Sequence, residues 1–202
     1  MTRVVFFLTL AFFCLGSEAK TEMVLGDSLS ASYGFDEHLG WVALLRQTLT
    51  KQSQHQVINA SISGETSAGA LARLPKLLNT HHPNIVIVEL GGNDGLRGYP
   101  LGMLKNNLHQ IVELVRAENA RVLLVGMRMP PNYGARYSEK FSAIYTELAQ
   151  SLSVPLVPFL LAKIATKPQW MQTDGIHPKA EAQQQILKNL MPFLQPLLHH
   201  KP

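Results

Sequence analysis

The chain has 202 residues, a formal net charge of +4 and a single cysteine. This length suits one domain with a sizeable core, and the basic residues are scattered singly, which gives little support to nucleic-acid binding. Because the only cysteine, Cys14, lies in an N-terminal apolar stretch, the remaining chain has no disulfide, cysteine nucleophile or thiolate metal site.

The first 19 residues have the pattern of a secretory signal peptide. Arg3 supplies a basic start, residues 4–15 are almost entirely apolar, and small residues end the segment at Ala19. The apolar run is shorter than the roughly 20 residues that span a membrane. We predict cleavage after Ala19, which leaves residues 20–202 as a single domain; an uncleaved N-terminal anchor is the alternative.

Apolar runs alternate with helical periodicity along the rest of the chain, and this predicts an α/β fold with a parallel sheet and helices on both faces. Strands are expected at 23–25, 57–58, 85–90, 122–125 and 154–157, and helices are centred on 41–49, 71–78, 104–115, 141–148 and 186–190.

Prolines refine these expectations. Pro75 is expected to kink or end the second helix, and Pro155 to place the fifth strand at a sheet edge. The last helix is expected to begin near Pro178. The tail from residue 192 to 202 contains three prolines and is expected to be loosely held.

The first strand runs directly into a serine, in the sequence Met-Val-Leu-Gly-Asp-Ser that ends at Ser28. Binding and chemistry in open parallel sheets take place at the carboxyl ends of the strands. We therefore predict that Ser28 is a nucleophile. The chain contains no Gly-x-Ser-x-Gly, so the nucleophile elbow of the α/β-hydrolases is absent.

A nucleophilic serine needs a base and a group that orients the base. Among the eight histidines, His177 stands out because Asp174 lies three residues before it and Gly175 permits a tight turn between them. Asp174 can then hold the imidazole in the tautomer that leaves one nitrogen free for Ser28. The alternative is an ordinary Asp-Gly turn followed by a surface histidine.

Two glycine-containing loops after strands are candidates for holding an oxyanion. Gly64 follows the second strand and offers a backbone amide, and Asn93 follows the third strand and offers a side-chain amide. Residues 91–95 are also consistent with ordinary turn chemistry. No clustered His and carboxylate pattern is present, so no metal site is expected.

Four blocks of the chain, in order, resemble those of the SGNH (GDSL) hydrolases. They are Gly26-Asp27-Ser28-Leu29, Gly64, Gly92-Asn93-Asp94 and Asp174-Gly175-Ile176-His177. The resemblance implies a flavodoxin-like three-layer α/β/α fold with a five-stranded parallel sheet. It implies a catalytic triad of Ser28, Asp174 and His177, and an oxyanion hole formed by the Ser28 amide, the Gly64 amide and the Asn93 side chain.

The resemblance also implies an activity. Members of the family cleave thioesters, aryl esters, lysophospholipids and some activated peptide esters, without a metal or cofactor. The chain is accordingly expected to cleave small-molecule esters and thioesters of fatty acyl groups through an acyl-enzyme. It is expected to be a periplasmic monomer with at most peripheral membrane contact and no nucleic-acid partner; secretion beyond the outer membrane is an alternative.

The resemblance places a mobile loop at residues 95–99, closing over the acyl chain. Substrate contacts are expected from Asp27, Leu29, Gly95, Leu96, Arg97, Gly98, Tyr99, Met129 and Ile176. Met129 and Pro131 depart from the family pattern beside the acyl pocket, which leaves the chain-length preference open. Two rival functions are a carbohydrate O-acetylesterase on the same scaffold and a non-catalytic periplasmic lipid-binding protein.

Overall fold

The computed structural model describes residues 20–51 and 55–199, so the predicted signal peptide lies outside the described residues. Within these two ranges, no helix is both long and apolar enough to cross a bilayer.

Five parallel strands form one sheet in the order β2-β1-β3-β4-β5. The strands are β1 (Lys20–Gly26), β2 (His55–Asn59), β3 (Ile85–Glu89), β4 (Arg121–Val125) and β5 (Leu156–Val157). The predicted parallel α/β sheet is confirmed, and the order is that of flavodoxin-like folds. The fifth strand lies at an edge of the sheet, as expected, although it covers only Leu156–Val157 of the expected 154–157 and begins just after Pro155.

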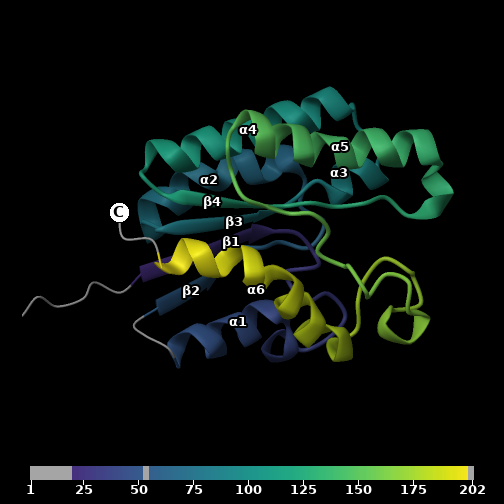
Figure 1. The fold of residues 1–202 in the computed structure, drawn as a ribbon, viewed down its shortest axis with the longest axis horizontal. Helices are drawn as coiled ribbons and strands as arrows, with labels where there is room; N and C mark the ends of the chain where they lie inside the picture. Colours follow the sequence, from purple (N-terminus) through teal and green to yellow (C-terminus); the bar gives the residue numbers. More distant parts are fainter. Residues whose placement is uncertain (1–19, 52–54, 200–202) are drawn as a thin grey trace, which may run out of the picture.

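Helices cover both faces of the sheet and make three layers (Figure 1). The helices α2 (Ser67–His81), α4 (Leu101–Ala117) and α5 (Ala135–Ser151) pack on one face, and α1 (Trp41–Thr50) and α6 (Gln183–His199) pack on the other. Successive strand residues point to opposite faces of the sheet. Leu25 packs in the core with α2, α4 and α5, and Val24 packs in the core with α1 and α6. Burial on both faces explains the continuous apolar strands.

The strand order creates the site. β1 lies between β2 and β3, so the chain leaves β1 toward one side and returns past it to the other. The carboxyl ends of β1 and β3 therefore meet at the point where the direction of winding reverses, which is where open α/β sheets bind ligands. In the register of this pair, Gly26 lies opposite Glu89.

Two expectations drawn from proline are wrong: that Pro75 ends the second helix, and that the tail is loosely held as far as His199. The alternative expectation at Pro75, a kink, stays a prediction. Pro75 does not end α2, which continues to His81 with Leu74 and Leu78 buried on either side of the proline. Residues 192–199 are also not loosely held, because α6 runs through Pro192 and Pro196 to His199; residues 200–202 lie outside the described part of the chain. Burial of apolar side chains outweighs the backbone hydrogen bonds that proline removes.

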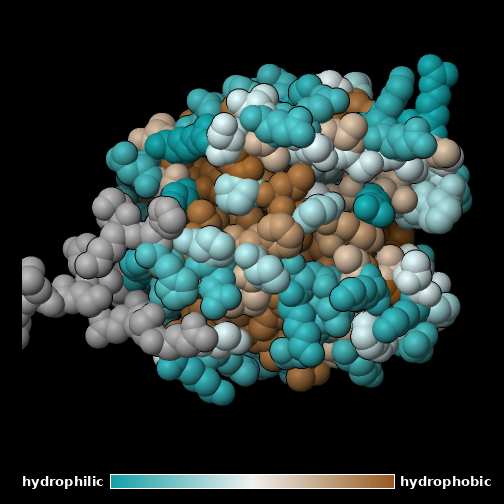
Figure 2. Space-filling view, in the orientation of Figure 1, coloured by the Kyte–Doolittle hydropathy of each residue, from teal (hydrophilic) through white to brown (hydrophobic). Residues whose placement is uncertain are grey.

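The start of the last helix also differs from the expectation. A short 3₁₀ turn, η4 (Ala180–Ala182), follows Pro178, and α6 begins only at Gln183. Figure 2 shows hydrophilic residues on the outer faces of the helices and hydrophobic residues gathered in the band between the α4 and α5 layer and α6.

Candidate active site

Ser28 lies two residues beyond the end of β1, in a tight turn. The Ala31 amide donates to the Asp27 carbonyl at 2.9 Å and the Tyr33 amide donates to the Ser28 carbonyl at 3.1 Å. The Leu29 amide donates to the Asp27 carboxylate at 3.1 Å. These bonds turn the chain sharply at the carboxyl end of the strand and leave Ser28 half-buried.

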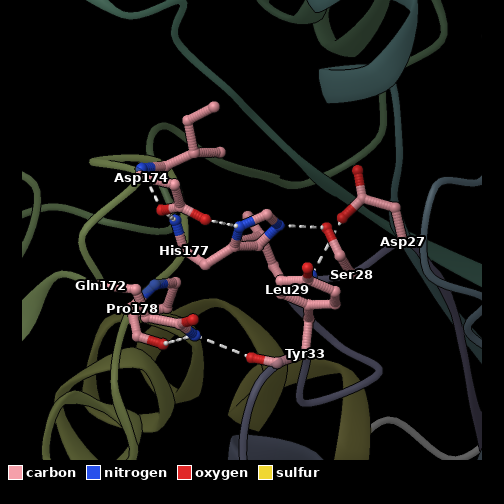
Figure 3. A network of polar contacts seen from close by, with 9 residues as sticks. Asp27, Ser28, Leu29, Tyr33, Gln172, Asp174, His177 and Pro178 are labelled. Carbon is pink, nitrogen blue, oxygen red and sulfur yellow. Dashed lines mark hydrogen bonds and ion pairs between the residues drawn. The ribbon is translucent and has the colours of Figure 1, made fainter.

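Ser28, His177 and Asp174 form one chain of hydrogen bonds, although Ser28 and His177 are 149 residues apart in sequence (Figure 3). Nε2 of His177 lies 2.8 Å from Oγ of Ser28, and Nδ1 of His177 lies 2.6 Å from Oδ2 of Asp174. With Nδ1 donating to Asp174, Nε2 is the nitrogen that can accept the serine proton. The structure therefore brings these three predicted residues together in the required order.

The aspartate is fixed by the turn that it begins. Its Oδ1 accepts the amides of Ile176 at 2.9 Å and His177 at 3.0 Å. Partial burial acts to raise the pKa of Asp174, but the hydrogen bonds from His177 and Ile176 outweigh it and hold the pKa below its ordinary value. Asp174 is therefore ionised at neutral pH and favours the tautomer described above.

Residues that the sequence did not single out position the histidine loop. The Gln172 amide donates to the His177 carbonyl at 2.8 Å, and Nε2 of Gln172 donates to the Tyr33 carbonyl at 2.8 Å and the Pro178 carbonyl at 3.2 Å (Figure 3). The Tyr33 ring lies 4.5 Å from the His177 ring, centroid to centroid. These contacts tie the histidine loop to the serine loop.

Residues 92–96 form a short helix, whereas the composition of residues 91–95 was also consistent with an ordinary turn. This helix, α3 (Gly92–Leu96), is separated from β3 only by Leu90 and Gly91, and the φ of 111° at Gly91 favours glycine. Asn93 in this helix donates from Nδ2 to Oδ2 of Asp27 at 3.1 Å. The side-chain amide of Asn93 is therefore oriented by the residue before Ser28.

The two backbone amides of the expected oxyanion hole lie after neighbouring strands. Gly64 adopts a φ of 79° in the segment between β2 and α2, and its carbonyl accepts Nη2 of Arg97 at 3.1 Å. Among residues 20–51 and 55–199, neither the Ser28 amide nor the Gly64 amide has a hydrogen-bond acceptor. Unpaired amides beside a nucleophile are available to an oxyanion.

A buried polar cluster connects the segment after β2 with α3. Oδ2 of Asp94 accepts the Ser67 amide at 2.9 Å, and Oδ1 accepts the Ser67 hydroxyl at 2.6 Å. Nδ2 of Asn107, on α4, donates to the Ser67 hydroxyl at 3.0 Å. Since Asp94 follows Asn93 and Ser67 begins α2, the cluster fixes the two predicted donor segments relative to each other.

Two acidic groups are buried behind the serine loop. Burial raises the pKa of Asp27 to about 6, even though hydrogen bonds to its carboxylate act in the opposite direction. Burial and the charge of Asp27 raise the pKa of Glu89 well above its ordinary value. One local signal in the sequence marks Glu89: it is an acid near the end of an otherwise apolar run.

The nine predicted substrate residues differ in position. Asp27 is only 2% exposed and its carboxylate is engaged by backbone and Asn93, which argues against the direct substrate contact expected of it. Gly95 and Met129 are buried, and the carbonyls of Gly95 and Leu96 accept the hydroxyls of Tyr137 and Tyr133. The remaining residues are half-buried or exposed: Leu29, Leu96, Ile176, Arg97, Gly98 and Tyr99.

A separate hollow of about 470 Å³ lies between α6 and the residues that follow β5. It is lined mainly by apolar side chains, including Phe159 and Phe193, with Arg128 beside Phe159. Ser28 and His177 do not line it. Within the described ranges, no group of three or more His, Cys, Asp or Glu residues is arranged to hold a metal ion.

Comparison with known proteins places this site in a family. The sequence profile of the GDSL-like lipase/acylhydrolase family matches residues 24–185. Thioesterase 1/protease 1/lysophospholipase L1 of Escherichia coli (strain K12) is 52% identical over 182 residues, covering 90% of this chain and 86% of the relative.

Solved structures agree with this match. The crystal structure of TesA superimposes with a TM-score of 0.86 at 50% identity, covering 88% of this chain and 99% of that one. The psychrotrophic esterase EstA from Pseudoalteromonas sp., inhibited by monoethylphosphonate, superimposes with a TM-score of 0.84 at 42% identity, covering 90% of this chain and 100% of that one.

Proposed function

The chain belongs to the GDSL-like lipase/acylhydrolase family, and from this membership and the site geometry we propose that it is a serine hydrolase of fatty acyl esters and thioesters. The observation that carries the proposal is the continuous chain of hydrogen bonds from Ser28 through His177 to Asp174. The activities in the name of the Escherichia coli relative, thioesterase and lysophospholipase, support the choice of acyl substrates.

In the proposed first step, Nε2 of His177 takes the hydroxyl proton of Ser28 while Oγ attacks the carbonyl carbon of the substrate. The distance of 2.8 Å between these atoms suits direct proton transfer. Asp174 stays ionised and stabilises the imidazolium that forms.

The carbonyl oxygen becomes an oxyanion as the serine attacks. The Ser28 amide, the Gly64 amide and the Asn93 side chain are the donors that we assign to it. Loss of one such donor typically costs about 2.7–4 kcal/mol of transition-state stabilisation. Because Asn93 uses one amide hydrogen for Asp27, its second amide hydrogen remains for the oxyanion.

Collapse of the tetrahedral intermediate breaks the bond to the leaving alcohol or thiol, which takes the proton from His177. A water then gives its proton to His177 and attacks the acyl-enzyme carbonyl. The second collapse releases the fatty acid and returns the proton to Ser28. The whole cycle involves no oxidation or reduction, and it converts one ester or thioester and one water into one acid and one alcohol or thiol.

We assign the acyl chain to the apolar residues beside the polar groups. Leu29 follows Ser28 and Ile176 precedes His177 in the sequence, so both apolar side chains belong to the loops that carry the catalytic residues. Arg97 and Tyr99 are exposed on the segment after α3, where the mobile loop is expected. We further propose that residues 1–19 direct export and that the mature enzyme acts as a periplasmic monomer.

The proposal is tested by hydrolysis of p-nitrophenyl esters from acetyl to palmitoyl, with the parent protein and the Ser28→Ala variant in the presence of chelator. We expect hydrolysis of medium and long chains by the parent, and no hydrolysis above the uncatalysed rate by Ser28→Ala. Octanoyl-CoA and a lysophospholipid then compare thioester with ester turnover.

The other outcomes separate the rival functions. Hydrolysis of acetyl esters alone supports a carbohydrate O-acetylesterase. Binding of fatty acid without turnover of any ester supports a lipid carrier. Activity that survives in Ser28→Ala contradicts the assignment of the nucleophile.

A further inference from the structure

Gly64 is held at its backbone carbonyl and free at its backbone amide. It lies between β2 and α2 with a φ of 79°, and its carbonyl accepts Nη2 of Arg97 at 3.1 Å. Among residues 20–51 and 55–199, this carbonyl accepts no other hydrogen bond. Because glycine moves readily between positive and negative φ, the bond from Arg97 restrains a backbone that would otherwise rotate. The amide that we assign to the oxyanion belongs to this same residue.

The backbone of Arg97 is fixed, so its guanidinium extends from a defined point. Arg97 follows α3 directly, and its amide donates to the Asn93 carbonyl at 3.1 Å. The carbonyl of the preceding residue, Leu96, accepts the Tyr133 hydroxyl at 3.0 Å. Arg97 therefore connects the helix that carries Asn93 to Gly64, and these two residues supply two of the assigned oxyanion donors.

No acid competes with the Gly64 carbonyl for the guanidinium. In the part of the chain that the structure describes, Arg97 forms no ion pair with an aspartate or glutamate. Glu65, the nearest acid in the segment after β2, is paired with Arg73 of α2, with Oε2 2.6 Å from Nε. Asp94, on α3, is buried and is bonded to the first residue of α2. The polar partner of the Arg97 side chain is therefore a backbone carbonyl.

The bond from Arg97 restrains a part of the segment that the buried cluster does not reach. The cluster ties Ser67 to Asp94, three residues after Gly64. A bond at Ser67 fixes the start of α2 but leaves the backbone dihedrals at Gly64 free to change. Arg97 supplies a second attachment to the same short helix, at Gly64 itself.

We propose that Arg97 is a positioning residue: its guanidinium holds the Gly64 carbonyl and so keeps the Gly64 amide directed to the oxyanion, beside the Asn93 side chain. The proposal rests on the proposed function, because it concerns a donor that the hydrolytic mechanism assigns. It gives Arg97 a role through a contact within the protein, whereas the family resemblance implies a contact with the substrate.

The kinetic test compares Arg97→Ala, Arg97→Lys and the parent on p-nitrophenyl butyrate, which carries no charge for an arginine to bind. We expect Arg97→Ala to lower kcat about tenfold with KM changed less than about twofold, since complete loss of one oxyanion donor costs about 10²–10³-fold in kcat. Lysine can still donate to the carbonyl, so Arg97→Lys should stay within about threefold of the parent. An Arg97→Ala variant with parental kcat, or with a loss confined to KM, would overturn the proposal.

A double-mutant cycle with Gly64→Ala separates positioning from direct contact with the substrate. The φ of 79° strains any side chain at residue 64, although its Cβ would lie 3.7 Å from Nη2 of Arg97, an ordinary contact. Gly64→Ala should therefore disturb the amide that Arg97 positions. Adding Arg97→Ala to Gly64→Ala should then lower kcat by less than about twofold. A second loss as large as that of Arg97→Ala alone would place its action on the substrate and overturn the proposal.

The matched control is Arg116→Ala. Arg116 is also an exposed arginine whose Nη2 donates to a backbone carbonyl, that of Leu152. It lies near the end of α4, which leads into the start of β4, at the end of the sheet away from Ser28. We expect its kcat and KM to match those of the parent. A loss equal to that of Arg97→Ala would contradict a role specific to Gly64.

The restraint itself is measured without turnover, by nuclear magnetic resonance of protein isotopically labelled at its glycine nitrogens. The Gly64 amide is the signal that Gly64→Ala removes. Its heteronuclear NOE, which reports picosecond to nanosecond motion, should fall in Arg97→Ala and stay parental in Arg116→Ala. An unchanged value in Arg97→Ala would overturn the proposal whatever the kinetics show. If the parent hydrolyses no ester, the proposed function fails, and this measurement still decides whether Arg97 holds Gly64.

Discussion

The buried cluster around Asp94 makes a prediction about stability. Asp94 is 1% exposed and its two oxygens accept the amide and the hydroxyl of Ser67. Asp94→Asn keeps the shape of the side chain but replaces one acceptor by a donor. The new amide group then faces either the Ser67 amide or its hydroxyl, and at least one hydrogen bond is lost.

The expected loss of stability follows from the hydrogen bonds between Asp94 and Ser67. A hydrogen bond to a charged group contributes about 1.5–3 kcal/mol, and a buried donor left without a partner adds a cost of about 1–3 kcal/mol. We therefore expect Asp94→Asn to lower the free energy of unfolding by about 2.5–6 kcal/mol. This is a large share of the roughly 5–15 kcal/mol that stabilises a typical domain.

Urea denaturation at pH 7, followed by circular dichroism, measures this difference. The matched control is Asp36→Asn, because Asp36 is exposed and caps only a three-residue 3₁₀ turn through the His38 amide. We expect the control to lose less than about 1 kcal/mol. An Asp94→Asn variant as stable as Asp36→Asn would refute the assignment of Asp94 as a structural anchor.

Three further predictions concern other parts of the fold. Tyr145→Phe removes the hydroxyl that donates to the buried Leu90 carbonyl at 2.8 Å, and we expect a loss of about 1–3 kcal/mol in urea denaturation; no loss would contradict that role. Leu194→Ala, in the segment first expected to be loose, should cost about 2–5 kcal/mol because Leu194 is fully buried, whereas a variant of parental stability would indicate a frayed helix end. The lowered pKa of Asp174 stabilises the fold above the pKa of the unfolded chain, and this stabilisation is lost as the pH falls through the lower folded value. The difference in urea midpoint between Asp174→Asn and the parent should therefore shrink between pH 6 and pH 3, and a difference independent of pH would argue against the bond to His177.

Much of the fold was predictable from periodicity. Buried parallel strands are continuous apolar runs, and the helices repeat apolar residues at three and four positions, so the five strands and their helices were found from the sequence. α2 continues past Pro75 and α6 past Pro192, because tertiary burial of apolar side chains overrides the local backbone preference of proline.

Only part of the candidate site could be predicted from the sequence. Ser28, Asp174 and His177 were found because each follows a pattern that chemistry requires, and the structure joins them by hydrogen bonds. Gln172 and Glu89 were missed because their importance lies in contacts between loops distant in sequence. A buried acid at a strand end was the only local signal of Glu89.

In the proposed mechanism Ser28 is the nucleophile and His177 activates it. EstA, the solved neighbour inhibited by monoethylphosphonate, suggests the reagent, which is a fluorophosphonate ester. Intact-mass and peptide mass spectrometry should find one phosphonyl group on Ser28 in the parent, and greatly slowed labelling in His177→Ala. Labelling at another residue would contradict the assignment of Ser28, and labelling of Ser28 at the same rate without His177 would contradict the role of the histidine.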